Sequence, residues 1–218
     1  ALVSRYLARR YVTECCGVPP TEVDIRRTPT HKKPPCLTPL PAQGNALPPE
    51  LAAANFNVSH HGSWVVLAAS TTTLVGVDVT RIELPGSKPV HEFLAAFETE
   101  FTSGEWAAIQ ASPSPLEAFY WWWAVKEAYA KARGDGLVMG LARVEFRGVT
   151  AAIADHSAPI RVALDGVEVP ECRLAASTLD DDHPVVVATL PVSHAVEPLG
   201  VHFPTDLVPP EDPPAPTL

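Results

Sequence analysis

The stretch F-Y-W-W-W-A-V-K-E-A-Y-A-K-A-R-G-D-G, residues 119–136, guides the interpretation of the whole chain. Alanine, lysine, glutamate and arginine favour helix, and neither proline nor glycine interrupts the run from Phe119 to Arg133. Gly134 follows this run and tolerates the left-handed backbone conformation in which many helices end. The sequence therefore predicts a helix that stops at this glycine.

An acid and a base share one face of this expected helix. Trp123, Glu127 and Lys131 are spaced four residues apart, so their side chains line up along the helix. A solvated glutamate–lysine pair at this spacing is common and contributes only about 0.2–0.5 kcal/mol. The spacing alone therefore leaves two interpretations open, a surface ion pair and a pair of catalytic groups.

The composition bounds the class of protein. The chain has 218 residues, of which 46% are hydrophobic and 19% are charged, so it can bury a sizeable core. Its net charge of −9 argues against affinity for nucleic acid or for an anionic membrane surface. No apolar run reaches the length of a membrane span. We therefore expect neither a nucleic acid nor a membrane as partner.

The cysteines and the chain ends bear on location. No two of the four cysteines have the spacing of metal ligands, so we expect reduced thiols in a cytoplasmic protein: Cys15, Cys16, Cys36 and Cys172. No secretory signal is recognisable. Because Ala1 lies inside an expected helix, we expect that a preceding segment is missing. Prolines crowd residues 28–50 and 204–218, which predicts a loop and a disordered tail.

The N-terminal region predicts a helix, a strand and a basic loop. Apolar residues recur with helical spacing in 1–16, and apolar and polar residues alternate as in a strand from Glu22 to Arg27. Positive charge then concentrates in an otherwise acidic protein, at Arg27, Lys32 and Lys33. Composition leaves open whether this is a solvated loop or a loop that binds phosphate.

The next expected strand ends in polar groups. Residues 55–62 alternate as a strand that enters a turn at Gly62, which leaves Ser59, His60 and His61 at the strand end. Hydroxyl and imidazole groups at this place either donate hydrogen bonds to a phosphate or belong to an ordinary turn.

A hairpin is expected after it, with one strand from Trp64 to Ser70 and its return strand from Leu74 to Val79. Alternation places Gly76, Asp78 and Thr80 together on one face of the return strand. A buried aspartate needs a partner, and a metal ion, an arginine or a backbone N–H group would each serve.

The remainder predicts a second half of the molecule. Thr102 and Glu105 have the pattern of a capping box ahead of a helix, and the acidic turn 180–182 is expected to be solvated. A helix is expected at 91–97 and strands at 141–146, 159–164, 167–174 and 184–190. The fold class is therefore α+β with two similar halves, 1–84 and 85–203, each a largely antiparallel sheet with packed helices, before a proline-rich tail at 204–218.

Four motifs in one order carry a resemblance. They are F-N-V-S-H (56–60), V-G-V-D-V (75–79), F-T-S-G-E-W (101–106) and W-A-V-K-E-A-Y-A-K-A-R-G (123–134). Together they resemble the 4′-phosphopantetheinyl transferase superfamily. The set is similar to its longer, monomeric, surfactin-activating type, and within that type to the eukaryotic enzymes that activate aminoadipate-semialdehyde dehydrogenase and fatty-acid or polyketide synthases.

The resemblance implies an enzyme. It would transfer 4′-phosphopantetheine from coenzyme A, its co-substrate, to a serine of an apo acyl or peptidyl carrier protein, giving holo carrier and 3′,5′-ADP. The implied carriers belong to fatty-acid synthase, to polyketide or peptide synthases and to aminoadipate reductase. The implied cofactor is Mg²⁺, which suits oxygen ligands and offsets the charge of a pyrophosphate. The implied state is a monomer.

The family pattern also implies roles for single residues. Asp78 and Glu127 match its two metal-binding acids, and Glu127 also matches its general base. Lys131 matches the lysine that holds the pyrophosphate and stabilises the leaving ADP. Contacts to coenzyme A are implied for Lys131 and for Arg27, Lys32, Lys33, Ser59, His60 and Lys126.

Two departures from the pattern keep other functions open. Thr80 stands where bacterial members carry a third acid, although the eukaryotic type lacks that acid too, and a water could take the coordination position. An arginine that relatives carry upstream would precede Ala1. The alternatives are a degenerate transferase fold that binds coenzyme A or a carrier without turnover, and an unrelated acidic scaffold whose motifs are helix caps and core packing.

Overall fold

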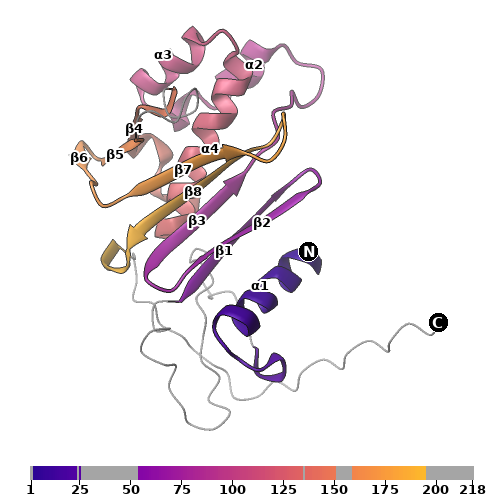
Figure 1. Cartoon of the computed structure of the whole chain (residues 1–218). Coiled ribbons are helices and arrows are strands. Elements are labelled where there is room, and N and C mark those ends of the chain that lie inside the picture. The colour runs from indigo at the N-terminus through magenta and orange to yellow at the C-terminus, as the bar shows by residue number, and fades with distance from the viewer. Residues whose placement is uncertain (1, 24, 26–53, 135, 151–158, 195–218) are drawn as a thin grey trace, which may run out of the picture.

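The computed structural model describes residues 2–23, 25, 54–134, 136–150 and 159–194 (Figure 1). Its helices are α1 (Leu2–Cys15), α2 (Val90–Ala95), α3 (Ser103–Ala111) and α4 (Pro115–Arg133), and its strands are β1 (Asn55–His61), β2 (Trp64–Ser70), β3 (Thr73–Val79), β4 (Val144–Arg147), β5 (Arg161–Leu164), β6 (Val167–Glu168), β7 (Arg173–Thr178) and β8 (Pro184–Pro191). The strands form three antiparallel sheets, of order β1-β2, β3-β8-β7 and β4-β5-β6. This arrangement confirms the predicted α+β class.

Helix α4 is the predicted tryptophan-rich helix, and it packs against β3 and β8 (Figure 1). Pro115 occupies its first turn, where no N–H group is needed, and it ends at Gly134, whose φ of +84° is left-handed. Gly76 lets the backbones of β3 and α4 meet, since a Cβ there would lie 2.1 Å from the carbonyl oxygen of Ala128. Side chains on the same face of β3 as Gly76 therefore point toward α4.

The sheet that contains β3 corrects one prediction. The sequence predicts that β3 returns against β2, but β3 pairs with β8 along its whole length, from Thr73 opposite Pro191 to Val79 opposite Val185. The main-chain partner of β2 is β1. The short turn between β2 and β3 favours a hairpin, because the two strands are neighbours in sequence. The apolar strand β8 pairs with β3 instead, although it lies far along the chain.

Three other expected strands differ from the structure. The expected strand from Glu22 to Arg27 is not found in the described residues: Glu22 ends a 3-10 helix (Pro20–Glu22), and Val23 and Ile25 lie outside any strand. The other residues of this range fall outside the described residues. The expected strand at 141–146 starts with a 3-10 turn (Leu141–Arg143) before β4. The expected strand at 167–174 divides into β6 and β7, which belong to different sheets.

Two apolar clusters form the core. The larger one surrounds α4 and buries Phe119, Trp121 and Trp122. The smaller one lies between α1 and β1 and includes Val12 and Phe56. β3 from the first predicted half shares a sheet with β8 from the second. The division at residue 84 stays a prediction. Within the described ranges, no helix is long and apolar enough to cross a membrane.

Candidate active site

A pocket of about 330 Å³ opens where β1, β3 and α4 meet. The strand end and the helix face that the sequence singles out both line it. Its walls are Val58, Ser59, His60 and His61 from β1, Asp78, Val79 and Thr80 from β3 and the residue after it, and Tyr120, Trp123, Glu127 and Lys131 from α4. The two predicted acids, far apart in sequence, thus face one cavity.

Asp78 is the more buried acid, with 5% of its surface exposed. Its Oδ1 accepts hydrogen bonds from the Nζ of Lys131 and from the Oγ of Ser59, the latter at 2.9 Å. Its Oδ2 is buried and has no hydrogen-bond partner in the described part of the chain. Burial raises the pKa of Asp78, and the Lys131 ammonium opposes that rise. A buried carboxylate oxygen without a partner is unfavourable until a ligand meets it.

Glu127 is half-buried on the opposite wall, on the face of α4 that the spacing predicts. Its carboxylate makes no hydrogen bond or ion pair with any residue that the structure describes. Burial raises the pKa of Glu127, the nearby Lys131 lowers it, and the Asp78 carboxylate raises it further. Asp78 and Glu127 therefore line one pocket, with Lys131 beside both acids.

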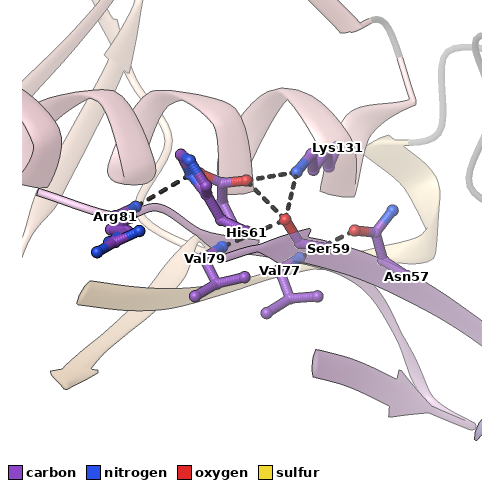
Figure 2. A network of polar contacts seen from close by, with 8 residues as sticks. Asn57, Ser59, His61, Val77, Val79, Arg81 and Lys131 are labelled. Atoms are coloured by element: carbon purple, nitrogen blue, oxygen red, sulfur yellow. Dashed lines mark hydrogen bonds and ion pairs between the residues drawn. The ribbon is translucent and has the colours of Figure 1, made fainter. Parts of the chain in front are cut away.

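Lys131 follows Glu127 by one helical turn and connects the helix to both strands. Its Nζ donates to Asp78 and, at 3.2 Å, to the Oγ of Ser59, and Figure 2 shows the Lys131 and Ser59 side chains pointing toward one another. A quarter of the Lys131 side chain is exposed, so the ammonium can also meet an anion that enters from solvent.

The hydroxyl of Ser59 is fully used within the protein. It donates to Asp78 and accepts from the Nζ of Lys131 and, at 3.3 Å, from the backbone N–H of Val79 (Figure 2). Its hydrogen and both lone pairs therefore have partners. Ser59 lies in the pocket as expected, but its proton is directed at Asp78 and not at an incoming phosphate.

The two histidines beside Ser59 differ from each other. His60 lines the pocket and is exposed. His61 accepts a hydrogen bond at its Nδ1 from the backbone N–H of Arg81, at 3.0 Å (Figure 2). The neutral His61 ring therefore carries its proton on Nε2.

Lys126 does not fit its predicted contact with coenzyme A. The side chain is fully buried, and its Nζ donates to the carbonyl oxygens of Leu141 and Val144 at 2.9 and 2.7 Å. It also pairs with Glu105 at 2.8 Å, and that carboxylate accepts from the backbone N–H groups of Thr102 and Phe146. All three protons of the ammonium point into the core, so none is left for a nucleotide.

The basic loop residues Arg27, Lys32 and Lys33 lie outside the described residues, so their contact stays a prediction.

Tyr120 lines the pocket, and its hydroxyl donates to the carbonyl oxygen of Glu83 at 2.6 Å. Its position three residues before Trp123 continues the helical stripe and was the available signal.

The donor set fits a hard divalent cation. Asp78, whose Oδ2 has no partner among the described residues, and Glu127, whose carboxylate is unbonded there, line one pocket. Magnesium binds proteins through one or two carboxylates and completes its shell with water and phosphate oxygens of a substrate. Within the described ranges, no group of three or more histidine, cysteine, aspartate or glutamate side chains could hold a metal. Asp78 and Glu127 are therefore suited to a cation whose remaining ligands include the phosphate oxygens of a substrate.

Fold and pocket define an α+β protein with two acids and a lysine around one cavity. The model of the 4′-phosphopantetheinyl transferase superfamily matches residues 74–188, more than half of the chain, and a model described as 4′-phosphopantetheinyl transferase, N-terminal, matches residues 1–72. The chain belongs to the 4′-phosphopantetheinyl transferase superfamily.

Named relatives agree with this membership. A phosphopantetheinyl transferase of Thraustochytrium sp. is 36% identical over 196 residues, covering 86% of this chain and 62% of the relative. The L-aminoadipate-semialdehyde dehydrogenase-phosphopantetheinyl transferases of Xenopus laevis and Homo sapiens are 34% and 33% identical, covering 89% and 86% of this chain. The chain spans 63% and 60% of the length of these two proteins, so it matches less than two thirds of each.

Proposed function

We propose that this chain transfers 4′-phosphopantetheine from coenzyme A to a serine hydroxyl of an apo carrier protein. In the transfer, the serine oxygen bonds to the phosphorus that carries pantetheine, and the bond from that phosphorus to the bridging oxygen breaks. The products are holo carrier and 3′,5′-ADP. The observation that carries the proposal is that Asp78, whose buried Oδ2 has no hydrogen-bond partner among the described residues, lines one pocket together with Glu127 and Lys131.

Glu127 is the proposed general base. A serine hydroxyl is a weak nucleophile and must lose its proton as it attacks. The Glu127 carboxylate has no partner among the described residues, and burial raises its pKa, which makes it a stronger base than a solvated glutamate. It therefore has both the free acceptor and the basicity that the step needs.

Lys131 is the proposed stabiliser of the leaving group. Its ammonium is held by Asp78 and Ser59 and is open to the pocket, so it can meet the phosphate on which negative charge develops. Because the lysine is already fixed by two hydrogen bonds, little reorganisation is needed when the charge appears.

Asp78 and Glu127 would together hold Mg²⁺. The bound cation would neutralise the pyrophosphate and orient it for displacement. Asp78 is suited to this task because its Oδ1 is fixed by two donors while its Oδ2 stays free. Glu127 cannot be ligand and base through the same lone pair, so the proposal assigns the two tasks to its two oxygens.

His60 is the proposed contact of the coenzyme A 3′-phosphate from the described residues, because it is exposed at the pocket. Arg27, Lys32 and Lys33 stay proposed partners of the same nucleotide, on the strength of their charge. Ser59 is assigned to the orientation of Asp78 instead, since its hydroxyl has no free donor.

The proposed partners are carrier domains of fatty-acid, polyketide and peptide synthases and of aminoadipate reductase. Two relatives are named for aminoadipate-semialdehyde dehydrogenase, which supports the last of these. A cytoplasmic monomer is proposed as well, and the free thiols of Cys15, Cys16 and Cys172 fit a reducing compartment.

Mass spectrometry tests the proposal. With Mg²⁺ and coenzyme A, a small panel of apo carriers should include one that gains the mass of a phosphopantetheine group. The variant Glu127→Gln should lose this activity by about 1,000-fold or more, because a general base and a metal ligand disappear together. Full activity in this variant would remove Glu127 from the mechanism. Binding of coenzyme A with no mass gain on any carrier would assign a binding module instead.

A further inference from the structure

Four side chains of β1 form a ladder along the free edge of β3. Asn55, Asn57, Ser59 and His61 each accept a hydrogen bond from a backbone N–H group twenty residues further along the chain. The donors, in the same order, are Val75, Val77, Val79 and Arg81, at 3.0, 3.2, 3.3 and 3.0 Å. Figure 2 shows the last three rungs of this side-chain ladder side by side.

The ladder replaces an ordinary main-chain pairing. The other edge of β3 is bonded to β8, and the main chain of β1 is bonded to β2, so the two strands meet through side chains. Since donor and acceptor numbers rise together, β1 and β3 run parallel. A buried edge N–H group requires an acceptor, and here every second side chain of β1 supplies one.

Two rungs flank Asp78. The rung of Asn57 holds the peptide group that joins Gly76 to Val77, one residue before Asp78, and the rung of Ser59 holds the peptide group that joins Asp78 to Val79. The ladder therefore fixes the backbone on both sides of the acid whose Oδ2 is free. The 78–79 peptide group is bonded to the Cα of Asp78 and the 76–77 peptide group lies one residue before it, so both bonds restrict the backbone that carries the carboxylate.

We infer that Asn57 is a positioning residue for Asp78 and thereby sets the affinity of the pocket for a divalent cation. The inference rests on the proposed function for the role of Asp78. Asn57 is only 8% exposed and is not part of the pocket wall, so it acts through the backbone and touches no ligand. Residues that orient metal ligands from behind typically change metal affinity by about 10- to 100-fold when removed.

Asn55 provides the matched control. It is a rung of the same ladder, is fully buried, and accepts from Val75 N, but that peptide group lies three residues before Asp78. Its amide also donates to the carbonyl oxygen of Thr73 at 2.6 Å, so removing it disturbs at least as many bonds. A merely structural ladder would make Asn55 and Asn57 equivalent with respect to the cation.

The conservative variant comes from the ladder itself. Ser59 shows that a serine hydroxyl can serve as a rung, at a distance close to that of Asn57. Asn57→Ser keeps an oxygen acceptor and Asn57→Ala lacks it, so the two differ by one atom. Asn57→Leu keeps the volume without an acceptor and serves if the alanine variant does not fold.

The test measures Mg²⁺ binding by calorimetry in the presence of coenzyme A, together with urea unfolding. Asn57→Ala should weaken Mg²⁺ binding by about tenfold, and Asn57→Ser should recover most of that loss. Asn55→Ala should bind Mg²⁺ within about twofold of wild type even where it unfolds at lower urea, because its rung lies two residues further from Asp78 than that of Asn57. The Mg²⁺ concentration for half-maximal transfer should follow the same order.

The outcomes separate this inference from the proposed function. Equal Mg²⁺ affinity in the Asn55 and Asn57 variants, or failure of both Asn57→Ala and Asn57→Leu to fold, would overturn the positioning role. If the wild type binds Mg²⁺ and coenzyme A but modifies no carrier, the transferase proposal fails, while the affinity order among the variants still decides the role of Asn57.

Discussion

Two lysines of helix α4 have the same chemistry and different surroundings. Lys126 is fully buried and donates to two backbone carbonyl oxygens and Glu105, whereas Lys131 is one quarter exposed and bonds to Asp78 and Ser59 in the pocket. Lys126 and Lys131 are five positions apart, so they point about 140° away from one another around the helix axis. Glu127 and Lys131 are four positions apart and differ by only about 40°. Helix geometry therefore divides α4 into a pocket face and a core face.

The core face holds the helix in place. Glu105 is shared by the capping box of α3, the Lys126 ammonium and the N–H group of Phe146, so one buried carboxylate joins α3, α4 and β4. Burial lowers the pKa of Lys126, and the Glu105 carboxylate opposes this. Charge on α4 therefore serves packing on one side and chemistry on the other.

The largest effect is expected on the core face. Lys126→Met removes one partner of a buried pair and leaves the Glu105 carboxylate uncompensated, so the free energy of unfolding should fall by about 3–5 kcal/mol. The protein that remains folded should keep the KM for coenzyme A of the proposed reaction. Urea unfolding and steady-state kinetics measure the two quantities.

A paired variant controls this experiment. Lys126→Met with Glu105→Gln removes both charges, so it should recover part of the lost stability. An unchanged free energy of unfolding together with a raised KM for coenzyme A would return Lys126 to the binding site.

On the pocket face the expected loss is catalytic. Lys131→Met should lower kcat/KM by about 100-fold, equal to about 2.7 kcal/mol of transition-state stabilisation, because no ammonium remains for the leaving phosphate. Its stability loss should be smaller than that of Lys126→Met, since the Lys131 side chain is partly solvated. The measurement combines carrier modification rates with urea unfolding.

Lys88→Met is the matched control for charge. Lys88 is exposed and lies outside the pocket wall, so this variant changes net charge equally and should leave kcat/KM near wild type. If Lys88→Met loses as much activity as Lys131→Met, the effect belongs to overall charge and not to the pocket.

The pocket face could be predicted from sequence because its signals are local. Four-residue spacing aligned Glu127 with Lys131, and strand alternation put Asp78 on the face of Gly76 that meets α4. The capping box of Thr102 and Glu105 was also predicted from a spacing of three. In each case the pattern lies within one element, whereas the meeting of Asp78 with Glu127 across two distant elements was implied only by the family resemblance.

The core face and the ladder could not be predicted in this way. The acceptors of Lys126 are carbonyl oxygens of Leu141 and Val144, which any sequence would offer, and only tertiary packing brings them near. The pairing of β3 with β8 likewise depends on segments far apart in the chain. Asn57 shows no local sign that its amide replaces a main-chain partner, so its place depends on the register of two strands that are not hydrogen-bonded through their backbones.

The smallest effect concerns folding stability without a cation, where the two faces should respond with opposite sign. Burial raises the pKa of Glu127, so the folded state binds this proton more tightly than the unfolded chain does. The stability that protonated Glu127 contributes is therefore fully present below its pKa of about 4.3 in the unfolded chain. It is lost as pH rises through the raised pKa of the folded state. In a chelator, Glu127→Gln should flatten the fall of melting temperature with rising pH and should melt at or above wild type at pH 7, whereas Lys126→Met should melt far below it. A steeper pH dependence in Glu127→Gln would show that the pocket carboxylate stabilises the fold, and the division of α4 into a costly chemical face and a stabilising core face would not hold.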